Sequence, residues 1–369
     1  MSDVKKNIGT HKPEFDGEWV RLGDVCEIVM GQSPDSSSYN TDCEGLPFYQ
    51  GNADFGETHP MPRTWCSEPK KVAEPGDILI SVRAPVGDIN VADERCCIGR
   101  GLAAVRSNGA GISNAFLALI LQSKRAYLDS MSTGSTFKAI GKKVLSSCEM
   151  PLYSREVQSR IACQVNWIDD CLRSSRRQLS ALDDLVKSQF VEMFGDPVEV
   201  IDATPLGSIA LLKAGNATTA ASISETDADG LYPCYGGNGL RGYAAEFTHE
   251  GVFPLIGRQG AQCGNVKLTS GKFRATEHAV VVQPTIEIDP IWLFHYLRYD
   301  DLGRLATGAA QPGLSVKNLN QIPVSIPPIA LQQQFADFVA RVDKLGFDVQ
   351  RQIEKLETLK QSLMQDYFG

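Results

Sequence analysis

The chain has 369 residues, 43% of them hydrophobic, so it can bury more than one core and is expected to form two or more domains. The sequence shows no signal peptide and no run of the roughly 20 apolar residues that a membrane span needs, which predicts a cytoplasmic protein without membrane contact. The net charge of -8 excludes a strongly basic nucleic-acid-binding protein, because contacts of Lys and Arg to phosphate normally dominate affinity for DNA. DNA binding would have to rest on local basic loops and on a partner that adds phosphate contacts.

In chain order, two globular parts, near residues 15–150 and 200–326, are each followed by a long helix. Short apolar runs between turn signals predict strands over 76–82, 89–92, 102–106, 252–257 and 278–283. Helices are expected after these strands, over 114–131 and 289–306. Each globular part is therefore predicted to have an α+β fold.

A proline precedes each long helix, in MPLYS at 150–154 and in IPPIA at 326–330. Beyond each proline the apolar residues recur in steps of three and four, as in a coiled coil. About 40 residues make a helix roughly 60 Å long, which is too long for one small domain. We expect the two helices to pair as an antiparallel coiled coil, which would relate the halves by an approximate two-fold axis. The alternative is that each helix packs only on its own domain.

An internal repeat supports this division. Five residues near the start of the first long helix align with five in the second at a constant offset of 174: Gln158, Ile161, Val165, Ile168 and Asp169 with Gln332, Phe335, Val339, Val342 and Asp343. Upstream, Tyr49 and Asn52 of YQGN align with Tyr235 and Asn238 of YGGN, and Arg83 and Arg258 stand at corresponding places before a turn that contains Gly. The sequence thus predicts two similar α+β domains, separated by two long helices, as a pseudo-two-fold repeat.

This order of elements resembles the specificity subunit of type I restriction-modification systems, and the resemblance covers essentially the whole chain. The second copy carries the closer match, TGAAQPGLSVKNLNQIPVSIPPIALQQQF at 307–335, whereas the first has TGSTFKAIGKK in place of the Gln-Pro-Gly loop. The resemblance implies a first target recognition domain over 1–154, a central helix over 155–195, a second recognition domain over 196–329 and a C-terminal helix over 330–369.

The resemblance also implies a function and partners. Each recognition domain would read one half of a two-part site in double-stranded DNA. The helices would set the spacer and dock two methyltransferase subunits, which bind S-adenosylmethionine, while restriction subunits would use ATP and Mg. No cofactor is expected in this chain. Independently of the family, two reading units held on a rod of fixed length would contact the duplex about one helical turn apart, so the rod length would set the spacer.

Base reading requires Arg, Lys, Asn or Gln on exposed loops, because these side chains pair with the edges of guanine and adenine. The candidates in the first copy are Gln50, Asn52, Arg83, Lys138, Lys142 and Lys143, and in the second they are Asn238, Arg241, Arg258, Gln259, Gln262, Gln311, Ser315 and Lys317. Ser315 is expected to cap a short helix whose amide end meets a phosphate. For every candidate the alternative is an ordinary solvated or turn-stabilising side chain.

Catalytic motifs are weak. GNGLRG at 237–242 has the spacing of a dinucleotide-binding loop, but no long strand precedes it and no helix follows it. Asp35, Glu68 and Lys70 imitate a metal-dependent nuclease triad across a long gap. The ten cysteines form no CxxC pair, so we expect no zinc site and mostly buried, reduced thiols. The sequence therefore predicts no enzyme. The alternatives left open are a standalone metal-dependent nuclease and a twin-domain scaffold that binds protein or carbohydrate.

Overall fold

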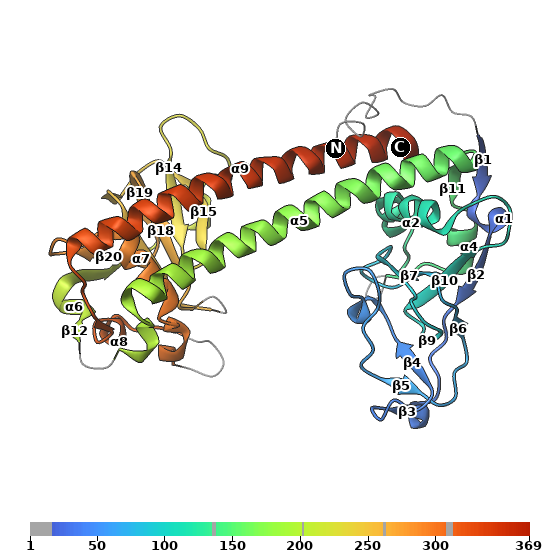
Figure 1. Cartoon of the computed structure of the whole chain (residues 1–369), viewed down its shortest axis with the longest axis horizontal. Helices are drawn as coiled ribbons and strands as arrows, with labels where there is room; N and C mark the ends of the chain where they lie inside the picture. Colours follow the sequence, from blue (N-terminus) through green and yellow to red (C-terminus); the bar gives the residue numbers. More distant parts are fainter. Residues whose placement is uncertain (1–16, 135–137, 201–202, 261–262, 308–312) are drawn as a thin grey trace. The chain divides into compact units, whose positions relative to one another are not determined.

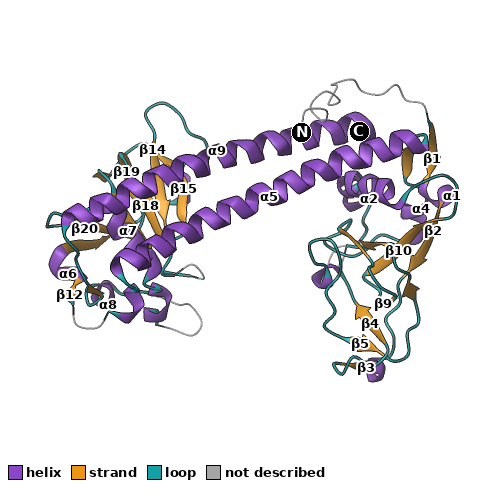
Figure 2. Cartoon of the chain, viewed as in Figure 1, coloured by secondary structure: helices purple, strands orange, loops and turns teal. Residues whose placement is uncertain are grey.

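A computed structural model describes residues 17–134, 138–200, 203–260, 263–307 and 313–369. The chain divides into two units, and each contains a segment of both long helices. The first unit comprises Met1–Ser174 and Ile353–Gly369, and the second comprises Ser175–Gln352. Strands and helices are mixed in both units, which confirms the α+β class (Figure 2).

The first unit contains a central antiparallel sheet and a distal mixed sheet. The central sheet has the order β2 (Cys26–Met30), β10 (Leu102–Ser107), β7 (Ile78–Ser81), β8 (Ile89–Val91). The distal sheet has the order β3 (Tyr39–Asn40), β5 (Trp65–Cys66), β4 (Leu46–Tyr49), β9 (Cys96–Ile98), β6 (Val72–Ala73). A two-stranded ladder joins β1 (Glu18–Arg21) to β11 (Glu149–Leu152) and brings the start of the unit beside the start of the long helix.

The second unit repeats this plan. Its central sheet has the order β13 (Ala210–Ala214), β20 (Ala279–Pro284), β17 (Phe253–Gly257), β18 (Val266–Thr269). Its distal sheet has the order β15 (Gly239–Ala244), β14 (Tyr232–Gly236), β19 (Lys272–Ala275), β16 (His249–Glu250). The ladder of β12 (Thr204–Pro205) with β21 (Pro323–Val324) corresponds to that of β1 with β11. The predicted strands at 76–82, 89–92, 102–106, 252–257 and 278–283 are confirmed as β7, β8, β10, β17 and β20.

The shorter helices are more broken than predicted. The helix expected over 114–131 is two helices, α2 (Asn114–Ser123) and α3 (Arg125–Ser130), which meet at Lys124. The helix expected over 289–306 ends as α7 (Pro290–Tyr299), because Asp301 adopts a left-handed backbone with φ 48, and a short 3-10 turn follows. The remaining short helices are α1 (Leu22–Val25), α4 (Lys142–Ser146), α6 (Leu206–Ile209) and α8 (Val316–Leu319).

The long helices are α5 (Arg155–Phe194) and α9 (Ile329–Phe368), each 40 residues long. Gly195, with φ +82, ends α5 in the left-handed conformation that glycine adopts without a steric penalty. In the first unit the end of α9 lies beside the start of α5 (Figure 1). There the Tyr153 hydroxyl donates a hydrogen bond to the Tyr367 carbonyl over 3.1 Å. Further along, Lys360 pairs with Asp169 at 2.6 Å, so the two segments run antiparallel.

The second unit pairs the other segments in the same sense. Phe190 of α5 packs edge-on against Phe335 of α9 at 5.3 Å. The side chains of Leu179 and Leu182 lie closest to Gly346, so residue numbers rise along one helix as they fall along the other. The antiparallel coiled coil is confirmed within each unit, and the alternative that each helix packs only on its own domain is wrong.

Each unit builds its main core from its central sheet, its short helices and both long helices. Tyr367 and Phe368 of α9 are buried in the first core, beside Phe116 and Tyr153. Phe190 of α5 is buried in the second core, beside Tyr296 and Phe335. Because the apolar ends of both helices are buried in these cores, the central sheets are held firmly against the helices.

A buried glutamine at the start of each long helix fixes the helix to its domain. The side chain of Gln158 accepts a hydrogen bond from the Ser113 backbone amide at 2.9 Å and donates to the carbonyls of Gly111 and Tyr153, each at 2.8 Å. Gln332 repeats this with the amide of Asp289 at 2.9 Å and the carbonyl of Pro327 at 2.8 Å. Ser113 and Asp289 cap α2 and α7, so each glutamine ties the start of a core helix to the start of a long helix.

Candidate nucleic-acid interface

Loops from four parts of the first unit meet where β7 ends and β10 begins. We define the first loop cluster as residues 50–52, 82–84, 99–101 and 138–140. Backbone hydrogen bonds join its members. The Gly101 amide donates to the Gln50 carbonyl over 3.1 Å, the Val82 amide donates to the Gly101 carbonyl over 2.8 Å, and the Ile140 amide donates to the Val82 carbonyl over 2.9 Å. These bonds fix the loops on the rigid end of the central sheet, as a reading surface requires.

Three predicted side chains project from this cluster. Arg83 and Lys138 are both exposed. They lie on neighbouring segments of the chain, because the Ala84 amide donates a hydrogen bond to the Lys138 carbonyl over 3.1 Å. Gln50 is also exposed, and its side-chain oxygen accepts a hydrogen bond from the Ser33 hydroxyl at 3.1 Å. The structure therefore brings Gln50, Arg83 and Lys138 together at one edge.

The other candidates of the first unit lie around this edge. The Asn52 amide is half-buried and approaches the Asp88 carboxylate at 3.4 Å, which indicates a turn-stabilising role. Asp88 in turn pairs with Arg125 at 2.8 Å. Lys142 and Lys143 are exposed on α4, which follows the cluster directly in the chain. Two adjacent exposed ammonium groups at the margin of the cluster suit contacts to phosphate.

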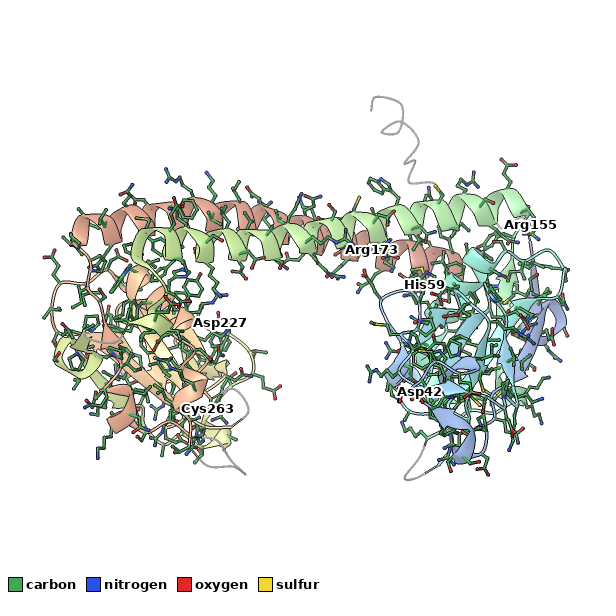
Figure 3. All side chains as sticks on the ribbon, turned by 60° about the horizontal axis from the view of Figure 1, so that its bottom comes forward. Asp42, His59, Arg155, Arg173, Asp227 and Cys263 are labelled. Atoms are coloured by element: carbon green, nitrogen blue, oxygen red, sulfur yellow. The ribbon has the colours of Figure 1, made fainter. Side chains whose placement is uncertain are left out.

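The distal sheet of the first unit also contacts α5. The loop that carries His59 lies beside Arg173, and the Glu57 carboxylate is 3.8 Å from the Arg173 guanidinium (Figure 3). The ring of His59 bonds the Val91 carbonyl at 2.9 Å and so fixes this loop to β8. These contacts orient the loops of the first unit relative to its own helix segment.

The second unit has an equivalent edge. We define the second loop cluster as residues 236–238, 257–259, 276–278 and 313–315. The Arg258 amide donates to the His278 carbonyl at 3.0 Å, and the Leu314 amide donates to the Arg258 carbonyl at 2.8 Å. These bonds match those from Val82 to Gly101 and from Ile140 to Val82 in the first cluster, so the two edges have the same backbone framework.

The hydrogen bonds correct one pairing inferred from the sequence. Arg83 forms a bridge with Ala139, and Gln259 forms the equivalent bridge with Gly313, which lies 174 residues beyond Ala139. The counterpart of Arg83 is therefore Gln259. Arg258 corresponds to the buried Val82, and the pairing of Arg83 with Arg258 is wrong by one residue. Because successive residues of an extended strand point to opposite faces, this shift changes which side chain faces outward.

Arg258 is accordingly a weaker candidate than Gln259. It is half-buried, and its Nε has no hydrogen-bond partner among the residues that the structure describes. Gln259 is exposed, as are Asn238 in the turn between β14 and β15 and Arg241 in β15. The stem of Arg241 lies over Gly236, where an added Cβ would be only 2.5 Å from Arg241 Cδ. The turn at 236–239 joins two antiparallel strands and is not followed by a helix, so it is not a dinucleotide-binding loop.

Ser315 caps α8 as predicted, because its hydroxyl accepts a hydrogen bond from the Asn318 amide at 3.1 Å. Lys317 is exposed on the same short helix. A role for either residue at a phosphate stays a prediction. Gln262 and Gln311 lie outside the described residues.

Residues that the sequence analysis missed also stand in the clusters. Arg100 is exposed in the first cluster, between Gly99 and Gly101, and its amide donates to the Ser33 hydroxyl at 3.3 Å. The matching position in the second cluster is Glu277, which pairs with the His278 ring at 3.2 Å. An arginine between two glycines was the available signal for Arg100. No pattern in the sequence pointed to Glu277 or His278.

The features typical of an enzyme have structural explanations. Asp35 caps the turn Ser36–Ser38, where hydrogen bonds from Ser37 hold the pKa of its carboxyl below the usual value. Across the described ranges, no three His, Cys, Asp or Glu side chains are grouped so that they could hold a metal ion. All ten cysteines are free, and six are buried, including Cys26 and Cys96, whose thiol pKa burial raises to about 12. Among the described helices, none is both long and apolar enough to span a bilayer.

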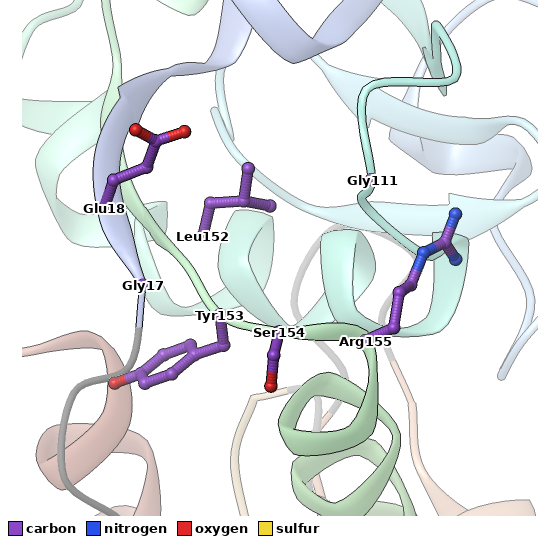
Figure 4. Close-up of a pocket in the computed structure, with 7 residues that line it drawn as sticks. All are labelled: Gly17, Glu18, Gly111, Leu152, Tyr153, Ser154 and Arg155. Carbon is purple, nitrogen blue, oxygen red and sulfur yellow. The ribbon is translucent and has the colours of Figure 1, made fainter.

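A shallow pocket at the start of α5 lies apart from these residues (Figure 4). Its lining comes from the start of β1, the loop between β10 and α2, the end of β11 and the start of α5: Gly17, Glu18, Gly111, Leu152, Tyr153, Ser154 and Arg155. None of the predicted base-reading residues lines it. The pocket therefore belongs to neither loop cluster.

Comparison with known proteins is consistent with this architecture. The family model for the type I restriction modification DNA specificity domain matches residues 16–182 and 202–358. A Methanocaldococcus jannaschii protein named for the type I restriction enzyme MjaX specificity subunit is 44% identical over 185 residues, which cover 50% of this chain and 43% of that protein. The EcoprrI specificity subunit of Escherichia coli is 43% identical over 162 residues, which cover 43% and 40%. The matched segments thus span less than half the length of both relatives.

A solved structure shares the fold over almost the whole chain. The S subunit of a type I restriction-modification system from M. genitalium superposes with a TM-score of 0.61 at 17% sequence identity, and the match covers 97% of each chain. At this identity the likeness establishes the fold alone.

Proposed function

The chain belongs to the type I restriction-modification DNA specificity domain family, and we propose on this premise that it is the DNA-reading subunit of a restriction-modification complex. Each unit reads one half of a two-part, asymmetric DNA site through its loop cluster. The observation that carries the proposal is the repetition of one loop framework in both units, each with exposed Arg, Lys, Gln or Asn side chains. These residue types pair with base edges in the major groove.

We assign the chemistry to partners. Two methyltransferase subunits carry S-adenosylmethionine, and restriction subunits, where present, use ATP and Mg. This chain acts as the targeting subunit without a catalytic centre of its own.

The long helices are the proposed docking surface for the methyltransferase subunits. Large apolar side chains remain exposed on them, including Trp167 at 46% on α5 and Leu345 at 57% and Phe347 at 63% on α9. Exposed aromatic side chains of this kind are enriched at protein interfaces. The helices are also proposed to set the spacer, so residues inserted near 172–182 should change the number of unread bases and leave each half-site unchanged.

The proposal is tested by methylation-sensitive sequencing of a host genome. The chain is co-expressed with the methyltransferase encoded beside it, and the genome is compared with one that received the methyltransferase alone. We expect a split motif that appears only with this chain. An insertion near 172–182 should then give the same half-sites with a different spacer, whereas altered half-site bases with an unchanged spacer would refute the spacer proposal.

Other outcomes would favour other functions. If the proteins co-purify and no new motif appears, the chain is a docking scaffold. If the purified chain cuts DNA with magnesium alone and Glu68→Ala abolishes cutting, it is a nuclease. Binding to random duplex that does not weaken as salt rises would also contradict the proposal, because phosphate contacts release counterions.

A further inference from the structure

Arg83 and Gln259 occupy one and the same position in the two loop clusters. Arg83 directly follows Val82, whose carbonyl accepts the Ile140 amide, and Gln259 directly follows Arg258, whose carbonyl accepts the Leu314 amide. Each also bridges the opposing loop, Arg83 at Ala139 and Gln259 at Gly313. The two side chains therefore leave equivalent points of the same framework and present different chemistry there.

Both side chains are available to a ligand. Arg83 and Gln259 are exposed, and within the described part of the chain no hydrogen bond or ion pair engages either side chain. Arg83 offers only donors, arranged as a fork, whereas Gln259 offers one acceptor and a pair of donors. In the major groove guanine presents two acceptors, O6 and N7, and adenine presents an acceptor at N7 and a donor at N6. A guanidinium that faces adenine would meet a donor with a donor.

The charge of the residues around Arg83 also differs from the charge of the residues around Gln259. Two further exposed cations, Lys138 and Arg100, add positive charge to the first cluster. The Lys138 carbonyl accepts the Ala84 amide, and Arg100 directly precedes Gly101, whose carbonyl accepts the Val82 amide. The position of Arg100 is taken in the second cluster by Glu277, which is engaged with the His278 ring at 3.2 Å and with the Thr218 amide at 3.1 Å. The first cluster is thus cationic, and the second is mixed in charge.

We propose that Arg83 selects guanine in the half-site read by the first unit and that Gln259 selects adenine in the half-site read by the second. This inference rests on the proposed function and adds to it the base class that each unit selects. A good bidentate contact discriminates against the wrong base by roughly tenfold to a hundredfold.

The test exchanges the two side chains in the whole complex. The chain is co-expressed with its methyltransferase as wild type, as Arg83→Gln and as Gln259→Arg, and the methylated motifs are compared. We expect Arg83→Gln to change or relax one guanine position of one half-site and to leave the other half-site intact. Gln259→Arg should change or relax one adenine position of the other half-site. Arg83→Lys should keep guanine, because lysine also donates to O6 and N7.

Arg95→Gln is the matched control, since Arg95 is exposed at the other end of β9 and pairs there with Glu74 at 3.3 Å. It should leave the motif unchanged. The inference is overturned if Arg83→Gln and Gln259→Arg retain the wild-type motif, if either changes both half-sites, or if Arg83→Lys loses methylation together with Arg83→Gln. If the wild type itself yields no split motif, the proposed function fails first. A wild-type motif with unaffected variants removes only this inference.

Discussion

His295 and Asp300, near the end of α7, are buried ionisable residues that respond to pH in opposite directions. Burial lowers the pKa of His295 to about 4, and Arg298 acts in the same direction. Burial raises the pKa of Asp300 to about 6, although the Arg304 guanidinium at 3.0 Å opposes this shift. Burial outweighs the ion pair, because Asp300 is 0% exposed and its Oδ2 has no partner among the described residues.

The two shifts predict opposing contributions to stability between about pH 4 and 6. The unfolded chain protonates His295 below its ordinary pKa of 6.5, so the contribution of His295 is lost as pH falls from there toward 4. The folded chain holds a proton on Asp300, so the contribution of Asp300 is lost as pH rises from 3.8 toward 6. In Asp300→Asn only the His295 effect remains. The free energy of unfolding of the second unit should then rise between about pH 4 and 6, by on the order of 2 kcal/mol more than in wild type.

Urea denaturation at several pH values measures this difference. His295→Phe is the complementary variant, because it keeps an aromatic ring against Phe335 and leaves only the Asp300 effect, so its stability should fall as pH rises. Parallel pH profiles for wild type and Asp300→Asn would show that Asp300 remains ionised in the folded chain.

The residues of the two loop clusters were only partly predictable from the sequence. Turn glycines and exposed Gln, Asn and Arg residues pointed to most of the loop clusters, and the cap at Ser315 followed from local pattern. The correspondence of Arg83 with Gln259 could not be predicted from local pattern. It depends on β-strand register, which is set by hydrogen bonds between distant segments, and a shift of one residue reverses the exposed face. Glu277 and His278 were missed for the same reason, since their place beside Arg258 arises only from sheet pairing.

Among the elements, the long helices were the most predictable, because their apolar spacing and their flanking Pro and Gly residues are local signals. The expected segment 155–195 is α5, which ends one residue earlier at Phe194. The break between α2 and α3 had no signal, and no Gly or Pro stands at Lys124. The role of Gln158 could not be predicted either. The internal repeat singled out the residue, but only the structure shows which backbone groups its side chain binds.

Gln158→Leu is predicted to destabilise the first unit by about 3 kcal/mol. The substitution removes the partner of the Ser113 amide and of two carbonyls, and each buried group left unsatisfied costs about 1 to 3 kcal/mol, partly offset by the apolar side chain. Chemical denaturation should show a lower midpoint with an unchanged slope. Gln178→Leu, at an exposed position of the same helix, is the control and should stay within about 0.5 kcal/mol of wild type. Equal stability of the two variants would mean that Gln158 does not anchor α5.

For the whole molecule, the net charge of -8 limits how the chain can hold DNA. Acidic side chains elsewhere would repel the duplex at long range, so the proposed function requires that favourable contacts be concentrated at a few exposed cations of the loop clusters. Loops that hold DNA weakly by themselves would depend on the partner subunits for most of the phosphate contacts. This division is the one that the proposed function requires, in which the chain selects bases and partner subunits supply affinity and chemistry.

The salt dependence of binding can locate these few contacts in the assembled complex. Lys142→Ala combined with Lys143→Ala should lower the slope of log affinity against log salt by about 1.8, and Lys317→Ala should lower it by about 0.9, because each phosphate contact contributes roughly 0.9. Both changes should weaken all duplexes equally and leave the selected bases unchanged. Lys272→Ala is the control, since its ammonium lies over the Phe247 ring at 4.9 Å, at the end of β19 away from the second loop cluster. Fluorescence anisotropy between 50 and 200 mM salt measures the slope. A slope reduced by Lys272→Ala and not by Lys317→Ala would place the DNA on another face of the second unit.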